Sequence, residues 1–183
     1  MSRLSSNNQF QALVSESEIQ RKVKELGEQI SKDYQGTEII AICVLKGSFI
    51  FTADLLRQIS VPNQIEFLAV SSYGASTESS GVIRILKDLE ISVENKHVLF
   101  IEDIIDTGLT MSHLIKVFET RKPASIKICT LLDNPDRREV ELSADYVGFS
   151  IPDEFVVGYG LDYAEGFRNL PGVYKLPKEY YSK

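Results

Sequence analysis

The sequence predicts an α/β fold in which a mostly parallel sheet is flanked by helices. Continuous apolar runs of strand length occur at 38–45, 64–72, 97–103 and 125–132. Segments of helical character separate several of these runs. Strands that alternate with helices and are apolar through their middles are typical of a parallel sheet covered on both faces.

The first helix is predicted from Ser15, which forms a capping box with Glu18, and it ends at Gly36. Its apolar positions recur at helical spacing: Ile19, Val23, Leu26, Ile30 and Tyr34. A second helix is expected within 47–59, and a third after residue 103, with an apolar face of Met111, Leu114, Ile115 and Phe118. Further strands are expected at 81–86, 144–150 and 155–160.

Length and composition favour one domain over residues 1–183, because 183 residues at 43% hydrophobic can bury one core. The net charge of -6 disfavours nucleic-acid binding. Neither a signal peptide nor a membrane-spanning run is recognisable, so we expect a cytoplasmic protein without a membrane partner. Cys43 and Cys129 lie within apolar runs and are interpreted as buried thiols.

Residues 98–110, VLFIEDIIDTGLT, place three carboxylates between a buried strand and a helix start. Backbone N–H groups and the Thr107 and Thr110 hydroxyls at such a place suit a phosphate, which the acids would repel. The carboxylates must therefore face a sugar diol, a protonated ring nitrogen or Mg²⁺. Simple capping of the helix by acidic residues is the alternative interpretation.

Several motifs resemble the hypoxanthine-guanine phosphoribosyltransferases of bacterial type. They are VLFIEDIIDTGLT, CVLKGSFIFTADLL (43–56), AVSSYG (69–74), GVIRILKDL (81–89), LLDNPDRR (131–138) and FVVGYGLDYAEGFRNLP (155–171). The resemblance implies a type I phosphoribosyltransferase fold with a small hood and a flexible lid at about 71–81. It also implies Mg²⁺-dependent transfer of phosphoribose from 5-phosphoribosyl 1-pyrophosphate to hypoxanthine or guanine in purine salvage. A homodimer or homotetramer is expected.

The resemblance also assigns roles in binding the phosphoribosyl donor. Asp106 becomes the general acid/base near N7 of the purine, while Glu102 and Asp103 hold the ribose hydroxyls. The 5-phosphate is assigned to Asp106, Thr107, Gly108, Leu109 and Thr110.

Pyrophosphate, metal and base are assigned to other segments by the same resemblance. Lys46, Gly47 and Arg168 match pyrophosphate contacts, with a cis peptide bond expected between Leu45 and Lys46. Phe155 is expected to stack on the purine and Val156 to read its edge through the backbone. Asp162 matches a Mg²⁺ ligand, alongside Glu102 and Asp103, and Ser72 and Tyr73 open the lid.

One position departs from the family pattern: Asn134 stands where a lysine usually donates to the purine 6-oxygen. A neutral amide is a weaker donor, so base preference is expected to soften toward xanthine or adenine. Arg137 and Arg138 are possible substitute donors, although solvated charges near a turn are the favoured interpretation. A non-catalytic regulator that senses phosphoribosyl pyrophosphate is the rival function; its basic surface is disfavoured by the net charge of -6.

Overall fold

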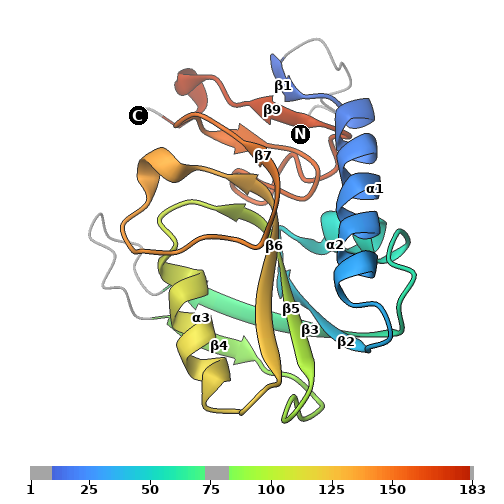
Figure 1. The fold of residues 1–183 in the computed structure, drawn as a ribbon. Coiled ribbons are helices and arrows are strands. Elements are labelled where there is room, and N and C mark those ends of the chain that lie inside the picture. The colour runs from blue at the N-terminus through green and yellow to red at the C-terminus, as the bar shows by residue number, and fades with distance from the viewer. Residues whose placement is uncertain (1–9, 73–82, 182–183) are drawn as a thin grey trace.

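The chain forms two sheets, and helices cover both faces of the larger one (Figure 1). The computed structural model describes residues 10–72 and 83–181. The larger sheet has six strands in the spatial order β4 (Ile83–Lys87), β3 (Asn63–Ser72), β2 (Ile39–Leu45), β5 (His97–Ile105), β6 (Ser125–Asp133) and β7 (Tyr146–Ser150). Strands β3, β2, β5, β6 and β7 run parallel, whereas β4 is antiparallel to β3. The predicted mostly parallel sheet is confirmed.

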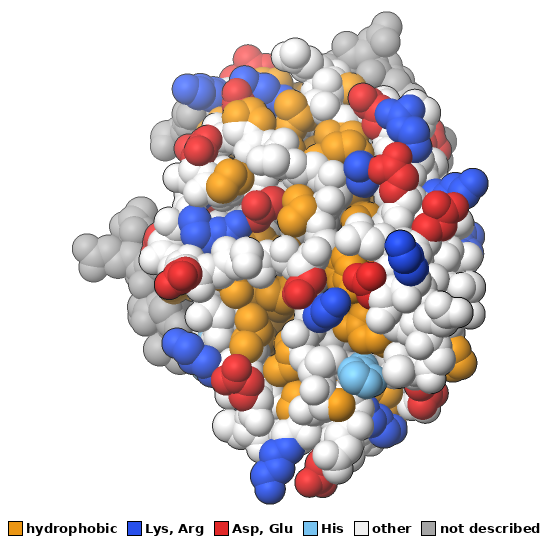
Figure 2. Space-filling model, in the orientation of Figure 1, with side chains coloured by type: hydrophobic (Ala, Val, Ile, Leu, Met, Phe, Trp, Pro, Cys, Tyr) orange, Lys and Arg blue, Asp and Glu red, His pale blue; other side chains and the backbone are white. Residues whose placement is uncertain are grey.

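Each face of this sheet has its own hydrophobic core. Helices α1 (Glu16–Asp33) and α2 (Phe49–Leu56) pack on one face, and α3 (Leu109–Glu119) packs on the other (Figure 1). The outer surface carries acidic and basic side chains intermingled with hydrophobic ones, several of which lie over α3 and β6 (Figure 2).

Helix α1 begins where the capping box predicts. The backbone N–H of Ser15 donates to Glu18 Oε2 at 2.9 Å, and the N–H of Glu18 donates to the Ser15 hydroxyl at 3.4 Å. Its buried residues include Ile19, Val23, Leu26 and Ile30, which confirms the predicted apolar face.

A second sheet of three short strands lies beyond the carboxyl ends of the parallel strands (Figure 1). Its order is β1 (Ala12–Val14), β9 (Val173–Lys175) and β8 (Val156–Val157). This sheet is the expected hood. Two short 3-10 helices complete the structure: η1 (Pro135–Arg137) follows β6, and η2 (Lys178–Tyr180) lies near the C-terminus.

Several predicted strands differ from the observed ones, and the strand expected at 144–150 begins only at Tyr146. The strand expected at 155–160 is limited to Val156–Val157, because Gly158 and Gly160 have φ values of 102° and 103° that end the extended conformation. The strand expected at 97–103 continues to Ile105. Most of the predicted lid at 71–81 lies outside the described residues. Among the described helices, none is long and apolar enough to cross a membrane.

Strand β2 lies between β3, which follows it in the chain, and β5. Strand order therefore reverses between β2 and β5. In open α/β sheets, ligands bind beyond the carboxyl ends of the strands at such a switch point. Lys46 and Gly47 follow β2, and the segment from Asp106 to Thr110 follows β5, so the predicted phosphate-binding residues lie at this switch point.

Candidate active site

Three segments meet at the switch point. Gly47 follows β2, and a Cβ at this position would lie 1.7 Å from Asp103 Oδ2 in β5. Gly160 packs equally closely, since its Cβ would lie 2.0 Å from the Gly47 carbonyl oxygen. Glycine is needed at both positions because backbone and carboxylate approach so tightly. The peptide bond between Leu45 and Lys46 is cis, as expected.

The acids of β5 do not share one side of the strand. Because β5 continues to Ile105, Glu102 and Asp103 point to opposite faces of the sheet. Asp103 lies against Gly47, whereas Glu102 lines a small cavity with Asp106 and the start of α3. A ligand that contacts both carboxylates would have to lie across the end of the strand.

Both carboxylates are held in surroundings that disfavour their charge. Burial, followed by the charge of Asp103, raises the pKa of Glu102 well above its usual value. Burial also raises the pKa of Asp103 to about 6, although backbone hydrogen bonds and Arg168 oppose the rise. Glu102 Oε2 is buried, with no hydrogen-bond partner in the described part of the chain. These oxygens suit a cation or a hydroxyl donor.

The described residues hold no group of three or more His, Cys, Asp or Glu side chains compact enough to bind a metal ion. Asp162, expected as a metal ligand with Glu102 and Asp103, instead pairs with Arg168 at 2.8 Å. The buried and poorly compensated carboxylates still fit a hard cation. Mg²⁺ commonly takes one or two protein carboxylates and draws its other ligands from water and phosphate.

The segment from Asp106 to Thr110 forms a pocket at the N-terminus of α3. Gly108 has a φ of 82°, and the N–H of Leu109 lies 3.3 Å from the Thr107 hydroxyl. A cavity of about 80 Å³ is lined by Glu102, Ile104, Ile105, Asp106, Thr107, Gly108, Thr110 and Met111. Its size and its position before the first N–H groups of a helix suit one phosphate.

Asp106 stands beside this pocket and is paired with an arginine. Its Oδ2 lies 2.9 Å from Arg137 Nη1, while its Oδ1 is buried and lacks a partner among the described residues. Burial raises the pKa of Asp106, and Arg137 opposes the rise. A carboxylate with raised pKa and one free oxygen is suited to accept and return a proton.

Lys46 and Arg168 converge on one carboxylate. Lys46 Nζ lies 3.1 Å from Glu165 Oε1, and Arg168 Nη2 lies 3.3 Å from Glu165 Oε2. Arg168 also donates to the Gly160 carbonyl oxygen at 2.9 Å. The two predicted pyrophosphate contacts are therefore brought together around an anion that belongs to the chain.

The predicted base-binding residues lie at the hood and after β6. Phe155 is 39% exposed and stacks on Tyr181, with ring centroids 5.0 Å apart. Val156 is buried in β8. Asn134 is only 2% exposed, and its Oδ1 has no partner in the described residues. Ser72 ends β3, and Tyr73 lies outside the described residues.

Sequence reasoning did not single out Glu165. The solvated interpretation holds for the exposed side chain of Arg137, although it is also paired, but it is wrong for Arg138. Arg137 contacts Asp106, and Arg138 is 15% exposed and pairs with Asp133. The arginine pair in LLDNPDRR was the available signal. It was not sufficient, because the distance between these arginines and the acids depends on how β5 and β6 pair.

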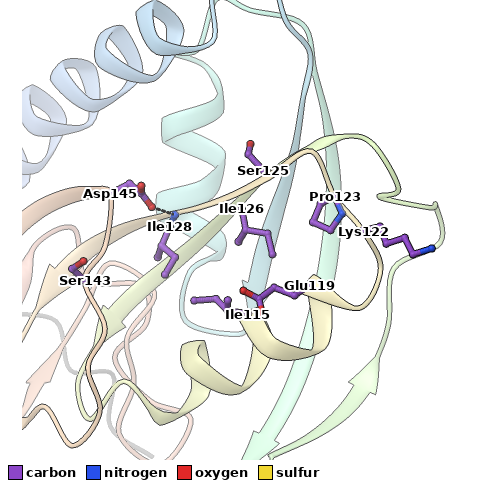
Figure 3. A pocket seen from close by; sticks show the side chains of 9 residues that line it. All are labelled: Ile115, Glu119, Lys122, Pro123, Ser125, Ile126, Ile128, Ser143 and Asp145. Carbon is purple, nitrogen blue, oxygen red and sulfur yellow. Dashed lines mark hydrogen bonds between the residues drawn. The ribbon is translucent and has the colours of Figure 1, made fainter.

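A separate cavity of about 400 Å³ lies at the other end of the sheet (Figure 3). Its lining comes from the end of α3, the start of β6 and the segment before β7, and it includes Ile115, Ile126 and Asp145. Asp145 accepts a hydrogen bond from the backbone N–H of Ile128 at 2.9 Å. None of the predicted site residues lines this cavity.

Comparison with known proteins agrees with this geometry. Residues 11–164 match the family described as phosphoribosyl transferase domain. The hypoxanthine-guanine phosphoribosyltransferase of Bacillus subtilis is 55% identical over 169 residues, which cover 92% of this chain and 94% of that protein.

Solved structures are similar throughout their length. The crystal structure of a hypoxanthine phosphoribosyltransferase from Staphylococcus aureus has a TM-score of 0.94 at 48% identity, covering 98% of this chain and all of that one. A hypoxanthine-guanine phosphoribosyltransferase from Bacillus anthracis has a TM-score of 0.88 at 51% identity, over 91% and 98% of the two chains. The resemblance noted in the motifs is confirmed, and the chain belongs to the phosphoribosyl transferase family.

Proposed function

We propose that this protein is a purine-salvage enzyme that transfers phosphoribose from 5-phosphoribosyl 1-pyrophosphate to hypoxanthine and guanine. The products are the nucleoside monophosphate and pyrophosphate. The observation that carries the proposal is the arrangement at the switch point: a phosphate-sized pocket, a carboxylate with raised pKa beside it, and two cations that converge on one anionic group. We infer that residues 1–183 act as one phosphoribosyltransferase domain.

The donor occupies the segment after β5. The backbone from Asp106 to Thr110, including Leu109, binds the 5-phosphate together with the threonine hydroxyls, because these N–H groups precede the first turn of α3. Glu102 and Asp103 accept hydrogen bonds from the ribose hydroxyls. Lys46, the Gly47 backbone and Arg168 bind the pyrophosphate, and the Arg168 fork suits two phosphate oxygens.

The base lies between the hood and the end of β6. Phe155 stacks on the purine ring, and the Val156 backbone contacts its edge; Asn134 lines the same region, and Ser72 and Tyr73 belong to the lid. Asp106 accepts the ring proton at N7 while the bond from N9 to ribose C1 forms and the bond from C1 to the pyrophosphate oxygen breaks. The electron pair of the broken bond leaves with pyrophosphate.

Mg²⁺ is the proposed cofactor, held by Glu102, Asp103 and Asp162 together with substrate oxygens. When bound, it neutralises charge that develops on the leaving pyrophosphate. The fit of the site rests on the two buried β5 carboxylates, whose pKa values are raised by burial; Glu102 has no compensating cation, and Arg168 offsets the rise at Asp103 only in part.

We also propose that the protein is a homodimer or homotetramer. Ile65 and Phe67 in β3 are 42% and 39% exposed, and Leu86 in β4 is 62% exposed. Strand alternation turns Ile65 and Phe67 to the face opposite Leu68 and Val70, which pack with α3, and Leu86 lies at the register shift between β3 and β4. Helix α2 leaves this strip uncovered, and a contiguous apolar strip is typical of a protein interface.

Steady-state kinetics test the proposed activity. The experiment measures pyrophosphate release with hypoxanthine, guanine, xanthine or adenine, in the presence and absence of Mg²⁺. We expect turnover with hypoxanthine and guanine that depends on Mg²⁺. Asp106→Asn should lower kcat by about 10²- to 10⁴-fold, as loss of a general base does. Asp136→Asn, an exposed acid on η1, is the matched control. Absence of pyrophosphate release with every base would refute the assignment.

A further inference from the structure

Arg137 occupies a fixed position beside the proposed general base. Its Nη1 lies 2.9 Å from Asp106 Oδ2, and its Nε lies 3.7 Å from Asp153 Oδ1. The segment that carries it is joined to the acid segment at both ends. The Asn134 N–H donates to the Ile105 carbonyl, and the Glu139 N–H donates to the Thr107 carbonyl, both at 2.9 Å. Arg137 is thus held within reach of whatever Asp106 contacts.

Asn134, in contrast, is enclosed. The residue is 2% exposed and follows directly after β6, whereas the Arg137 side chain is 49% exposed while it contacts Asp106. An enclosed neutral amide makes a poor replacement for a lysine that reaches a ligand. A half-exposed guanidinium retains donors for a ligand while one of its N–H groups stays on Asp106, because it has five N–H donors.

The atoms on the edge of the purine ring explain why the contact of Arg137 with Asp106 and the burial of Asn134 matter for base selection. A 6-oxopurine presents N7 and O6 side by side on one edge, whereas adenine presents an amino donor in place of O6. If Asp106 meets N7, the group beside Asp106 meets the substituent at position 6. Arginine carries only donors, so it pairs with a 6-oxo group and cannot pair with a 6-amino group.

We propose that Arg137 reads the purine 6-oxygen and sets the preference for 6-oxopurines in this protein, in the role that Asn134 cannot fill. This inference rests on the proposed function. The guanidinium contacts the base during turnover, so Arg137 is a specificity-determining residue at the site. Arg137→Lys keeps a cation and should retain most of the preference, while Arg137→Ala removes it.

Arg137 also affects the ionisation of Asp106. The charged groups that face Asp106 are Arg137, Asp153, Arg138 and Glu139, and Arg137 is the first of those that lower its pKa. Asp106 must be ionised to accept the N7 proton. Removal of Arg137 therefore raises the pKa of Asp106 and moves the acid limb of the kcat/KM profile to higher pH.

The test compares kcat/KM for hypoxanthine with the inhibition constant of adenine in the parent, Arg137→Ala, Arg137→Lys and Arg57→Ala. Arg57 is the matched control, because it is an exposed arginine at the C-terminal end of α2 that pairs with Asp54. We expect Arg137→Ala to lose about 10- to 100-fold in kcat/KM for hypoxanthine, the scale of a charged base contact. Adenine binding should stay equal or tighten, and the acid limb should shift upward.

Arg137→Lys should fall between parent and Arg137→Ala, and Arg57→Ala should match the parent. A hypoxanthine-to-adenine ratio within twofold of the parent in Arg137→Ala would overturn the inference and return the role to Asn134. If the parent itself does not turn over hypoxanthine, the proposed function fails and the inference fails with it. If the parent is active and the ratio is unchanged, the inference alone fails.

Discussion

Glu165 is an anion that stands where the proposed substrate anion would bind. It contacts Lys46 Nζ at 3.1 Å and Arg168 Nη2 at 3.3 Å, and these two contacts lower the pKa of Glu165. Pyrophosphate must displace this carboxylate to reach the same cations. The side chains of Lys46 and Glu165 are 67% and 66% exposed, so the displaced ion pairs are weak and screened.

Glu165→Gln should tighten pyrophosphate binding by about two- to five-fold, because the neutral amide no longer competes with pyrophosphate for Lys46 and Arg168, and the exposed ion pairs that are lost are weak. Isothermal titration calorimetry with pyrophosphate and Mg²⁺ measures the effect, and the gain should shrink at high salt. Glu28→Gln on the outer side of α1 serves as the control. Unchanged or weaker binding would indicate that Glu165 orients the cations and does not compete with the ligand.

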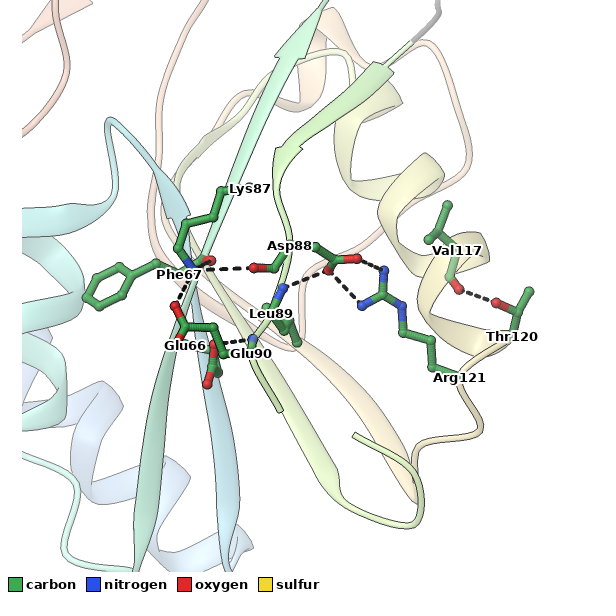
Figure 4. Close-up of polar contacts among 9 residues, drawn as sticks. All are labelled: Glu66, Phe67, Lys87, Asp88, Leu89, Glu90, Val117, Thr120 and Arg121. Carbon is green, nitrogen blue, oxygen red and sulfur yellow. Dashed lines mark hydrogen bonds and ion pairs between the residues drawn. The ribbon is translucent and has the colours of Figure 1, made fainter. Parts of the chain in front are cut away.

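At the scale of elements, the end of α3 is joined to the chain after β4 by one ion pair (Figure 4). Arg121 donates from Nη1 and Nη2 to the two oxygens of Asp88, each at 2.8 Å. The same guanidinium lies 4.1 Å from the Phe118 ring centroid. Two-point contact and stacking make this pair stronger than a single exposed contact.

Arg121→Ala should lower the free energy of unfolding by about 1 kcal/mol, a value limited by the partial exposure of both side chains. The Arg121 hydrogen bonds lower the pKa of Asp88 below its usual value of 3.8. The stabilisation by the Asp88–Arg121 pair is therefore complete above the usual Asp pKa of 3.8. It is lost as the pH falls below this value and through the lower pKa that Asp88 has in the folded state. Urea denaturation from pH 7 to 3 measures it, with Arg57→Ala as a control expected to change stability by less than about 0.5 kcal/mol.

Elements with strong local patterns were predicted well, and those that depend on distant partners were not. Helix α1 and strands β2, β5 and β6 follow from capping residues and apolar runs in the sequence. Strands β1 and β9 were missed because each has three residues and gains its hydrogen bonds from pairing Ala12 with Tyr174. No local periodicity reports such a contact.

For the whole molecule, the exposed strip on β3 and β4 determines the expected behaviour in solution. Phe67→Lys should shift the proposed oligomer toward monomer, because a charge in an apolar interface must be desolvated on association. Sedimentation velocity across a concentration series measures the shift, and Val147→Lys, at an exposed position on β7, is the control. An unchanged sedimentation coefficient in Phe67→Lys would place the interface elsewhere or exclude self-association.

The sequence by itself determined the α/β class, the first helix, the positions of the central strands along the chain and the position of the acid segment, because these depend on local apolar patterns and spacing. It also identified the family through its motifs. Only the tertiary structure decided which charges face one another. Parallel pairing of β5 with β6 brings Arg137 to Asp106, and the turn after Gly158 brings Glu165 to Lys46. Such contacts join residues far apart in the chain, so their distances follow from strand register and loop conformation, which no local pattern encodes.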